Sequence, residues 1–404
     1  MGFEYRVGPV AGTSGLSTSM VRMAVSRSYT PAVVRAAVLE RPGEPLTIAD
    51  VRLDEPASGE VRVRMTASGV CHSDLHVRDG EWPRPGPFVI GHEGAGVVTA
   101  VGPDVDAAGT GLRPGVPVAL SWIAPCGACR ACRTGRPWLC VANGAVRHRM
   151  ADGSTRLHLA DGRDALAYCG LGTMAEEATV AASAAVPVPA GLDPAVSALI
   201  GCCVSTGVGA ALRTAAVAEG ASAVVIGLGG VGLSVVMGLV LAGASSIVVV
   251  DRMAAKLDVA RELGATGAIL AGPDRDATLA AIREATDGGP DHAFEAIGLS
   301  STIELAVASL PPGGTATLVG MTPFGERASF EVFPFVDGGR RILGSNYGST
   351  IPATDFPRYA QLQLDGRLPV ERLIERRIGL DEIEDAFATM RRGEGLRRVV
   401  VFDR

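Results

Sequence analysis

The chain has 404 residues, of which 47% are hydrophobic and 20% are charged. A single hydrophobic core stops growing near about 250–300 residues, so this length predicts roughly two domains. The composition is that of a globular protein and excludes large-scale disorder. The formal net charge of −6 argues against a nucleic-acid partner. The sequence contains no block of basic residues that would suggest binding to an anionic membrane surface.

The first 34 residues contain serine, threonine and arginine with a single acidic residue, Glu4. This composition is similar to that of a transit peptide. A flexible extension or an over-long start is favoured instead, with Met20 and Met23 as alternative first residues. Because no secretory signal peptide is recognisable, we expect a cytoplasmic protein with a flexible extension at residues 1–34.

The segment from about residue 35 to residue 120 has the alternating apolar pattern and the frequent Gly and Pro of a β-rich domain. The clearest strand signals are AAVLE (36–40), LTIADVRL (46–53) and EVRVRMTASGV (60–70). A cysteine-rich loop follows at 126–140, and the polar stretch at 143–164 predicts an exposed excursion. Residues 193–218 predict a helix that is broken near Gly207.

Residues 222–250 are the most apolar stretch, and their length alone would allow a transmembrane helix. Four glycines between 227 and 232 would weaken such a helix, and no aromatic or charged belt flanks the stretch. We favour a buried strand at 223–226, a glycine turn, a helix at 231–242 and a second buried strand at 247–250. Parallel strands that are covered on both faces are apolar throughout, which explains the pattern.

The β/α alternation continues with helices at 254–263 and 277–285 and with strands near 268, in DHAFEAIG (291–298) and in TATLVGM (315–321). This order predicts a doubly wound parallel sheet in an α/β protein. A helix at 355–365 and a strand at 398–402 cannot extend that sheet by simple continuation, so we assign them to the first domain. The predicted division is a first domain at 35–203, a nucleotide-binding domain at 204–347 and a closing part of the first domain at 348–404.

A glycine-rich turn between the predicted strand and helix has the G-x-G-x-x-G pattern of dinucleotide sites. Its candidate contacts to the pyrophosphate are Gly227, Gly229, Gly230, Val231 and Gly232.

The residues after the second strand bear on the choice of dinucleotide. Asp251 ends that strand, where its carboxylate can bind the ribose hydroxyls and repel a 2′-phosphate. NAD is therefore favoured over NADP, although Arg252 could partly accommodate a phosphate. Lys256, the only lysine of the chain, could reach the same ribose, the alternative being a chance surface lysine.

Two groups of residues suggest metal sites. The first has the spacing Cys126-x2-Cys129-x2-Cys132-x7-Cys140, which fits a closed tetrahedral zinc site; a disulfide pair or an iron–sulfur cluster is the alternative. The second is Cys71, His92 and Cys202, each of which has an ordinary structural interpretation when taken singly. Together they supply two sulfurs and an imidazole, a set that leaves the fourth position of zinc open for water or substrate.

From about residue 35 to the end, the sequence resembles the zinc-containing medium-chain alcohol dehydrogenases. The resemblance is carried by GVCHSDLH (69–76), GHEGAG (91–96), the four-cysteine loop, GCCVSTGVGAA (201–211), GLGGVG (227–232), Asp251, Lys256 and GEGLRRVVVF (393–402). It implies a GroES-like β-rich catalytic domain plus a Rossmann coenzyme domain. It also implies reversible hydride transfer between a primary or aromatic alcohol, its aldehyde and NAD(H), with two zinc ions per chain.

The resemblance implies roles for individual residues. Cys71, His92 and Cys202 would hold the catalytic zinc, and the four-cysteine loop a structural zinc. Glu93 would lie beside the catalytic metal, and Asp74 would support His92. Ser73 would take the alcohol proton and pass it through the nicotinamide ribose to His76. The remaining implied cofactor contacts are His72, Val319 and Arg397.

Five further cysteines and histidines carry no implied role. Cys203 is interpreted as a packing residue, and Cys169, His148, His158 and His292 as structural or surface residues.

Within the family, CRACRTGRPWLC (129–140) and the tail at 355–390 look closest to the actinobacterial branch with mycothiol-dependent formaldehyde dehydrogenases. The alternative substrate is therefore an S-(hydroxymethyl)mycothiol-type thiol adduct. Two other functions are alternatives to a zinc alcohol dehydrogenase. The first is a zinc-free quinone or enoyl reductase, but such relatives generally lack the Cys71, His92 and Cys202 set. The second is a non-catalytic nucleotide-binding protein, which would not need Ser73 and His76 as a relay. By the same resemblance we expect a homodimer or homotetramer.

Overall fold

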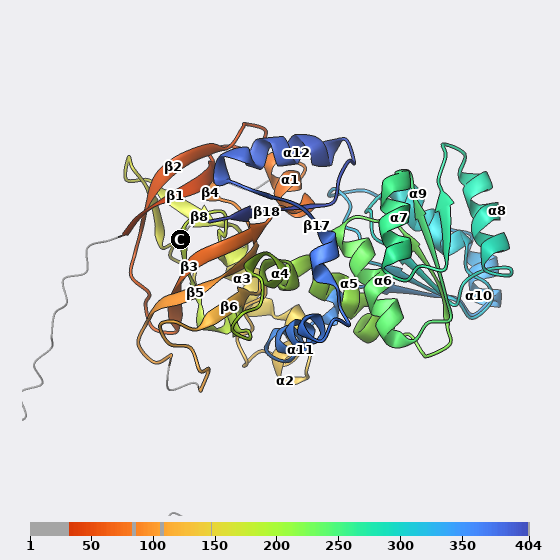
Figure 1. The fold of residues 1–404 in the computed structure, drawn as a ribbon, viewed down its shortest axis with the longest axis horizontal. Helices are drawn as coiled ribbons and strands as arrows, with labels where there is room; N and C mark the ends of the chain where they lie inside the picture. The colour runs from red at the N-terminus through yellow and green to blue at the C-terminus, as the bar shows by residue number, and fades with distance from the viewer. Residues whose placement is uncertain (1–31, 83–85, 106–108, 147, 403–404) are drawn as a thin grey trace, which may run out of the picture. The chain divides into compact units, whose positions relative to one another are not determined.

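The computed structural model describes residues 32–82, 86–105, 109–146 and 148–402 (Figure 1). Strand β1 (Ala32–Leu39) begins at Ala32, inside the predicted extension at 1–34, and pairs there with Leu53. The rest of that predicted extension lies outside the described residues.

A closed barrel with strand order β1-β2-β7-β8-β4 forms the first part of the fold. Its other strands are β2 (Thr47–Leu53), β4 (Phe88–Val89), β7 (Leu157–Leu159) and β8 (Asp164–Ala167). The expectation of an exposed excursion at 143–164 is therefore wrong for its second half. Leu157 and Leu159 face the barrel core, and His158 between them bridges Asp54 Oδ2 at 2.7 Å and Asp164 Oδ1 at 2.9 Å. The period of two was present in the sequence, but the surrounding polar residues concealed it.

A second sheet has the order β10-β6-β5-β3-β18-β17, with β9 also paired to β3. Its strands are β3 (Glu60–Gly69), β5 (Glu93–Val101), β6 (Pro117–Leu120), β9 (Glu177–Ala181), β10 (Ala185–Pro187), β17 (Ile374–Ile378) and β18 (Arg397–Val401). Figure 1 shows the C-terminal strand β18, drawn in blue, beside β3, drawn in orange, and Val399 pairs with Gly69. The end of the chain therefore returns to the sheet that is built mainly from the first 190 residues.

The third sheet has six parallel strands in the order β13-β12-β11-β14-β15-β16. The strands are β11 (Ser222–Ile226), β12 (Ser246–Asp251), β13 (Gly267–Leu270), β14 (His292–Glu295), β15 (Thr315–Leu318) and β16 (Arg341–Gly344). The helices that connect them are α6 (Gly230–Ala242), α7 (Ala254–Glu262), α8 (Arg275–Ala285), α9 (Ser300–Ala308) and α10 (Val332–Asp337). The strand order reverses between β11 and β14, the place where such sheets bind nucleotides. The predicted strand–turn–helix–strand at 222–250 is confirmed.

The helix Pro194–Thr214 lies between the second and third sheets and belongs to the largest core cluster. It consists of α4 (Pro194–Leu199), α5 (Ser205–Gly209) and two π-helical segments, Ile200–Val204 and Ala210–Thr214. It is apolar and long enough to cross a membrane, with a mean hydropathy of 1.9, but 89% of its most apolar window is buried inside the protein. It is a core helix.

The predicted helix break near Gly207 is wrong, since the helix runs through this position. A Cβ atom at Gly207 would lie 2.4 Å from the carbonyl oxygen of Val231 in α6. Gly207 therefore lets two helices approach each other, which a propensity scale cannot distinguish from a helix break.

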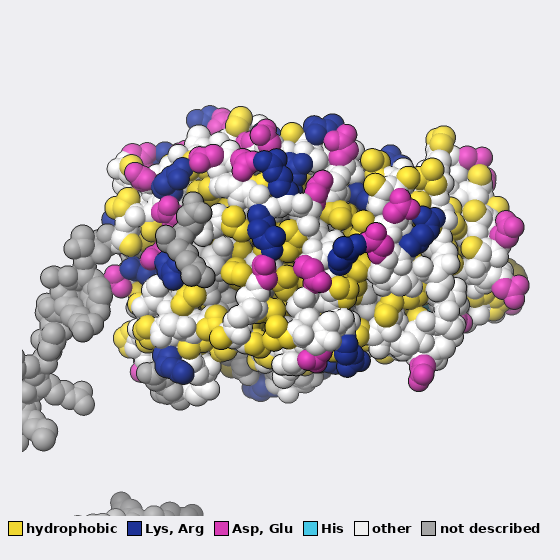
Figure 2. Space-filling view, in the orientation of Figure 1, with side chains coloured by type: hydrophobic (Ala, Val, Ile, Leu, Met, Phe, Trp, Pro, Cys, Tyr) yellow, Lys and Arg dark blue, Asp and Glu magenta, His cyan; other side chains and the backbone are white. Residues whose placement is uncertain are grey.

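The remaining helices are short or lie at the end of the chain. They are α1 (His72–Arg78), α2 (Arg130–Arg133), α3 (Val141–Val146), α11 (Pro352–Leu364) and α12 (Ile383–Arg391). Single 3₁₀ turns occur at Pro137–Leu139, Tyr168–Gly170, Ala182–Ala184, Tyr347–Ser349, Val370–Leu373 and Leu380–Glu382. On the face shown in Figure 2, basic and acidic side chains are interspersed rather than gathered by sign.

Candidate active site

Four buried side chains from three distant segments converge at the inner end of the second sheet. One potential ligand atom from each of Cys71, His92, Glu93 and Cys202 lies within 4.8 Å of the others. Cys71 lies between β3 and α1. His92 immediately precedes β5, and Glu93, the first residue of β5, pairs with Gly69 of β3. Cys202 comes from the π-helical segment Ile200–Val204.

The approach of that helix depends on Gly201. A Cβ atom at Gly201 would lie 2.5 Å from the carbonyl oxygen of Leu120 in β6. Only a glycine before Cys202 lets the helix come this close to the sheet.

Asp74 holds the residues of the cluster in place through hydrogen bonds. Its carboxylate, fully buried, accepts hydrogen bonds from the amides of Cys71 (3.2 Å) and Gly91 (3.2 Å) and pairs with His92 Nδ1 at 3.0 Å. Because Nδ1 is engaged in this way, Nε2 is the nitrogen of His92 left for a metal. Burial alone would lower the pKa of His92, but the charges of Asp74 and Cys71 outweigh it and raise the pKa well above its ordinary value.

The thiols of Cys71 and Cys202 share a hydrogen bond, which lowers the pKa of Cys71 and raises that of Cys202. Two sulfurs, one oriented imidazole and one carboxylate in a buried cluster are a donor set that fits zinc.

Glu93 and Arg397 form a buried ion pair at the edge of the cluster. Burial raises the pKa of Glu93 to about 7, against the opposing charge of Arg397. The side chain of Arg397 also lies against the glycine loop, since a Cβ atom at Gly230 would be 2.5 Å from its Cδ. The guanidinium is therefore next to the loop implied to bind pyrophosphate, but its partner in this structure is Glu93.

The side chains implied to form the proton relay lie on α1. His76 Nδ1 is 2.5 Å from Glu81 Oε2, and the His76 ring stacks on Trp82 with 4.5 Å between centroids. The ring of His72 is tilted against the His76 ring, with 5.2 Å between centroids. Among the described residues no hydrogen bond joins the side chains of Ser73 and His76, so the structure brings them onto one helix without connecting them.

Sequence reasoning missed three residues around this helix. Glu81 and Trp82 follow in the turn after α1, and Trp82 Nε1 donates to the carbonyl oxygen of Thr322, 3.4 Å away in the loop after β15. The ring of Tyr168 lies edge-on to His92, 5.5 Å between centroids, and its hydroxyl donates to the carbonyl oxygen of Ser73 at 3.4 Å. An acidic residue five positions after a candidate relay histidine was the one signal available; nothing local marked Tyr168.

The glycine loop has the geometry of a dinucleotide site. Gly227 has a φ of 93°, and a Cβ atom at Gly232 would lie 1.8 Å from the carbonyl oxygen of Gly227. These two positions therefore require glycine, one for the turn and one for the contact between α6 and the loop. Gly229, Gly230 and Val231 form the first turn of α6 with its free amides.

The carboxylate of Asp251 accepts hydrogen bonds from the amides of Leu228 (2.7 Å) and Met253 (2.9 Å) at the end of β12. Val319 directly follows β15, so it lies at the same carboxyl edge of the sheet as the glycine loop. Within the described part of the chain, Lys256 forms no ion pair with Asp251: its Nζ donates to the carbonyl oxygen of Gly393, at 2.7 Å, in the loop before β18. Arg252 is exposed.

The four cysteines at 126–140 also converge, with their sulfurs all within 4.8 Å of one another. The amide of Cys129 donates to Cys126 Sγ (3.3 Å), and that of Cys126 donates to Cys140 Sγ (3.4 Å). Such bonds favour thiolates: hydrogen bonding from the Cys132 backbone lowers the pKa of Cys129 to about 6. All four are free thiols, in a loop that fits a closed zinc site better than a pair of disulfides.

Residues 57–190 match the alcohol dehydrogenase GroES-like domain, and residues 230–364 match the zinc-binding dehydrogenase family. The NDMA-dependent alcohol dehydrogenase of Amycolatopsis methanolica is 36% identical over 377 residues, covering 91% of this chain and 98% of that one. The S-(hydroxymethyl)glutathione dehydrogenase of Escherichia coli is 35% identical over 370 residues, covering 91% of this chain and 99% of that one. The chain belongs to the zinc-containing alcohol dehydrogenase family.

A solved structure supports the same family assignment. Benzyl alcohol dehydrogenase from Acinetobacter calcoaceticus superposes with a TM-score of 0.85 at 31% identity, covering 92% of this chain and all of that one. The GroES-like and Rossmann folds implied by the sequence are confirmed, as is an oxidoreductase of this family. Two cysteines and a histidine are the known catalytic zinc ligands of alcohol dehydrogenases, so the donor set at Cys71, His92 and Cys202 is that of the family.

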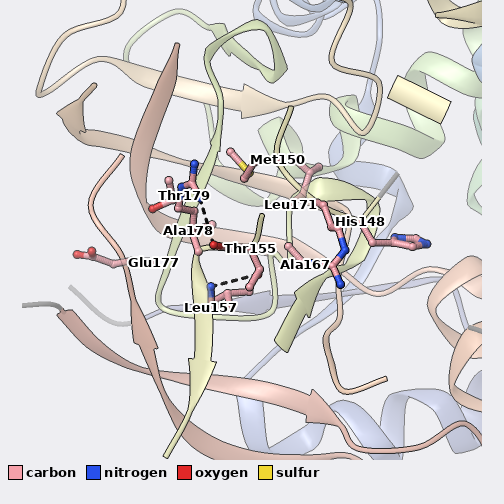
Figure 3. A pocket seen from close by; sticks show the side chains of 12 residues that line it. His148, Met150, Thr155, Leu157, Ala167, Leu171, Glu177, Ala178 and Thr179 are labelled. Atoms are coloured by element: carbon pink, nitrogen blue, oxygen red, sulfur yellow. Dashed lines mark hydrogen bonds between the residues drawn. The ribbon is translucent and has the colours of Figure 1, made fainter. Parts of the chain in front are cut away.

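Two cavities in this dehydrogenase lie outside the cluster. One, shown in Figure 3 between His148, Thr155 and Thr179, has a volume of about 10 Å³, which is room for about one water molecule. Thr155, which lines it, donates to the carbonyl oxygen of Ala165 at 2.5 Å. The other, of about 180 Å³, lies between Cys126 and residues 169–171. Neither is lined by a residue of the catalytic cluster.

Proposed function

We propose that this protein is a zinc-dependent dehydrogenase that moves hydride reversibly between a primary or aromatic alcohol, its aldehyde and NAD(H). The observation that carries the proposal is the buried convergence of Cys71, His92 and Cys202, with His92 oriented by Asp74. Bound zinc would act as a Lewis acid that lowers the pKa of the alcohol in one direction and polarises the carbonyl in the other.

The chain's own residues would handle the proton and exclude water. In the proposed relay, Ser73 Oγ accepts the alcohol proton and His76 receives it by way of the cofactor ribose. Glu81, bonded to His76 Nδ1, holds the ring in one orientation, and Trp82 covers the ring face against solvent. Glu93 and Arg397 form an ion pair beside the cluster, so neither charge is buried without a partner of opposite sign.

The proposed cofactor content is two zinc ions and one NAD per chain. Asp251 supports NAD, because its carboxylate stands at the end of β12, where the ribose of a bound dinucleotide lies. Gly227, Gly229, Gly230, Val231 and Gly232 would hold the pyrophosphate, with His72 and Arg397 beside it and Val319 on the same edge of the sheet. Arg252 and Lys256 are proposed contacts of the adenosine ribose; for Lys256 this requires exchange of its bond to Gly393.

The substrate is proposed from the surroundings of the cluster and from the relatives. Tyr168 gives the cluster an aromatic wall, and benzyl alcohol dehydrogenase is a similar structure; both support an aromatic or primary alcohol. The second candidate is a thiol adduct of formaldehyde, the S-(hydroxymethyl)mycothiol type, supported by the S-(hydroxymethyl)glutathione dehydrogenase at 35% identity.

Initial rates with benzyl alcohol, ethanol and formaldehyde, each with and without mycothiol or glutathione, separate these candidates. NAD, NADP and the acceptor NDMA are compared in the same assay. We expect turnover of benzyl alcohol with NAD, without any thiol. Strict dependence on an added thiol would transfer the assignment to the thiol adduct, and the absence of any turnover would refute both.

A matched pair of cysteine variants tests the ligand assignment. Cys71→Ala should lose the catalytic zinc and all turnover. Cys203→Ala, an equally buried cysteine outside the cluster, should keep about two zinc ions per chain and its activity. Equal behaviour of the two variants would contradict the assignment.

We also propose a homo-oligomer, a homodimer or a homotetramer, formed through the open edge of the third sheet. Strand β16 ends that sheet, and the segment around it carries exposed apolar side chains at Met321, Phe324, Phe330, Val332, Phe333 and Val336. Phe333→Glu should reduce the mass measured by light scattering. Leu364→Glu, an exposed leucine on α11, should leave it unchanged, and a monomeric wild type would refute the proposal.

Two further parts of the proposal concern domains and location. We propose a catalytic domain at 35–203 and 348–404 around a coenzyme domain at 204–347, which is supported by the strand pairing of β18 with β3. We propose a cytoplasmic location, which is supported by eight free cysteines, since thiols persist in reducing compartments.

A further inference from the structure

Three consecutive residues after β16 adopt the left-handed conformation. Tyr347, Gly348 and Ser349 have φ values of 56°, 61° and 54°. A bulky residue such as tyrosine rarely adopts this region and does so only where its surroundings enforce it. The turn is therefore held by contacts, and those contacts lie on the helix that carries Cys202.

The turn is pressed against the backbone of the helix Pro194–Thr214. A Cβ atom at Gly348 would lie 2.4 Å from the carbonyl oxygen of Ser205, and one at Gly209 would lie 2.3 Å from the carbonyl oxygen of Gly348. Neither position can accept a larger residue. The geometry places Tyr347, which is 2% exposed, directly over the π-helical segment.

Side-chain hydroxyls bond to carbonyls of this helix around Cys202. Tyr347 Oη donates to the carbonyl oxygen of Gly201 at 2.5 Å, and Ser205 Oγ donates to that of Ile200 at 2.6 Å. Thr350 Oγ1 donates to the carbonyl oxygen of Ser205 at 3.1 Å. Ile200 and Gly201 belong to the π-helical segment that carries Cys202, where the hydrogen-bond register differs from that of an α-helix.

We propose, on the basis of the function proposed above, that Tyr347 is a positioning residue: its hydroxyl fixes the Gly201 carbonyl and thereby sets the place of Cys202 Sγ in the catalytic cluster. Gly201 immediately precedes Cys202, so a rotation of its peptide unit moves the cysteine. The same hydroxyl also donates to Ser121 Oγ at 3.2 Å, so its one proton is shared between the two acceptors, and the Tyr347 ring lies 4.6 Å, between centroids, from the ring of Trp122. Ser121 and Trp122 follow β6, so the turn after β16 is tied to both the helix and the second sheet.

Tyr347→Phe keeps the ring and removes only the hydroxyl. Two control variants remove comparable buried hydroxyls elsewhere. Thr350→Val removes the bond to Ser205 on the same helix, and Tyr359→Phe removes a hydroxyl on α11 that lies beside Arg213 and Asp355. Ser121→Ala is a second variant at the same contact and should reproduce the effect of Tyr347→Phe in weaker form.

The readout is the metal site. With cobalt(II) at the catalytic site, the visible spectrum of Tyr347→Phe should shift, and its zinc should pass to a chelator about tenfold faster than that of the wild type. kcat should fall about tenfold with little change in KM for the alcohol or in NADH binding. Thr350→Val and Tyr359→Phe should lower the melting temperature of the metal-free protein without moving the cobalt spectrum.

An unchanged spectrum and zinc release rate in Tyr347→Phe would overturn the inference, and so would equal shifts in the two controls. If Tyr347→Phe does not fold, an unshifted spectrum in Ser121→Ala overturns it. Failure of the proposed function looks different: the wild type would then bind no metal at Cys71, His92 and Cys202 or would not oxidise an alcohol.

Discussion

Replacement of Asp74 by asparagine tests how the catalytic cluster is held. The carboxylate is fully buried and receives three donors: the amides of Cys71 and Gly91 and the Nδ1 of His92. Asparagine has nearly the same shape, but it offers one acceptor oxygen and turns an NH₂ group toward a donor. At least one of the three hydrogen bonds is therefore lost.

A hydrogen bond to a charged group contributes about 1.5–3 kcal/mol. Changing the partner that orients a metal-binding histidine typically costs about 10–100-fold in metal affinity, which is about 1.4–2.7 kcal/mol at 25 °C. The two magnitudes agree, so the loss of one orienting bond accounts for the expected effect. We therefore expect Asp74→Asn to weaken zinc binding at the catalytic site about 10–100-fold.

The assay is competition for zinc with a chromophoric chelator, in which Cys71→Ala identifies the signal of the structural site. Asp355→Asn is the control, because Asp355 is 1% exposed and accepts bonds from the Ile351 amide (2.7 Å) and Arg213 (2.5 Å), neither of which belongs to the cluster. It should destabilise the protein without changing zinc affinity. Retention of zinc affinity within about twofold in Asp74→Asn would refute the reasoning.

Three further outcomes are expected. Asp251→Asn should raise the NADP/NAD ratio of kcat/KM about tenfold, because it removes the charge that repels a 2′-phosphate; an unchanged ratio in steady-state assays would contradict the NAD assignment. Cys129→Ser should reduce zinc from about two to about one per chain and lower the melting temperature, since a closed site stabilises its loop; elemental analysis that still finds two would be inconsistent with it. Burial raises the pKa of Glu295 above its ordinary value of 4.5, so its stabilising contribution is full below pH 4.5 and is lost as the pH rises through the folded-state pKa. Glu295→Gln lacks this titration, so its melting temperature relative to the wild type should improve as the pH rises above 4.5, and a constant difference would count against it.

Much of the candidate site could be predicted from the sequence because its chemistry lies in short motifs. Cys71 and Asp74 stand in one turn, and His92 and Glu93 are neighbours in the chain. The glycine pattern at 227–232 and the spacing of the four-cysteine loop are equally local. In each case the function needs particular atoms at a fixed separation along the backbone, and the sequence displays that separation directly.

Other parts depended on contacts that no local pattern records. Gly207 reads as a helix breaker, yet it lies inside a continuous helix because α6 packs against it. His158 and its neighbouring leucines read as an exposed loop, yet they form a barrel strand that is held by Asp54 and Asp164. Tyr347 adopts a left-handed backbone conformation, and its hydroxyl bonds to Gly201, a residue 146 positions away in the sequence.

The partners of the charged side chains also could not be read from the sequence. The sequence by itself determined the fold class, the two candidate sets of metal ligands and the glycine-rich loop, because residue type and spacing suffice for these. Only the tertiary structure decided that Arg397 pairs with Glu93 and that Lys256 bonds to Gly393 rather than to Asp251. A buried or half-buried charge takes the nearest partner that the packing provides, and that partner is set by how distant segments meet in space.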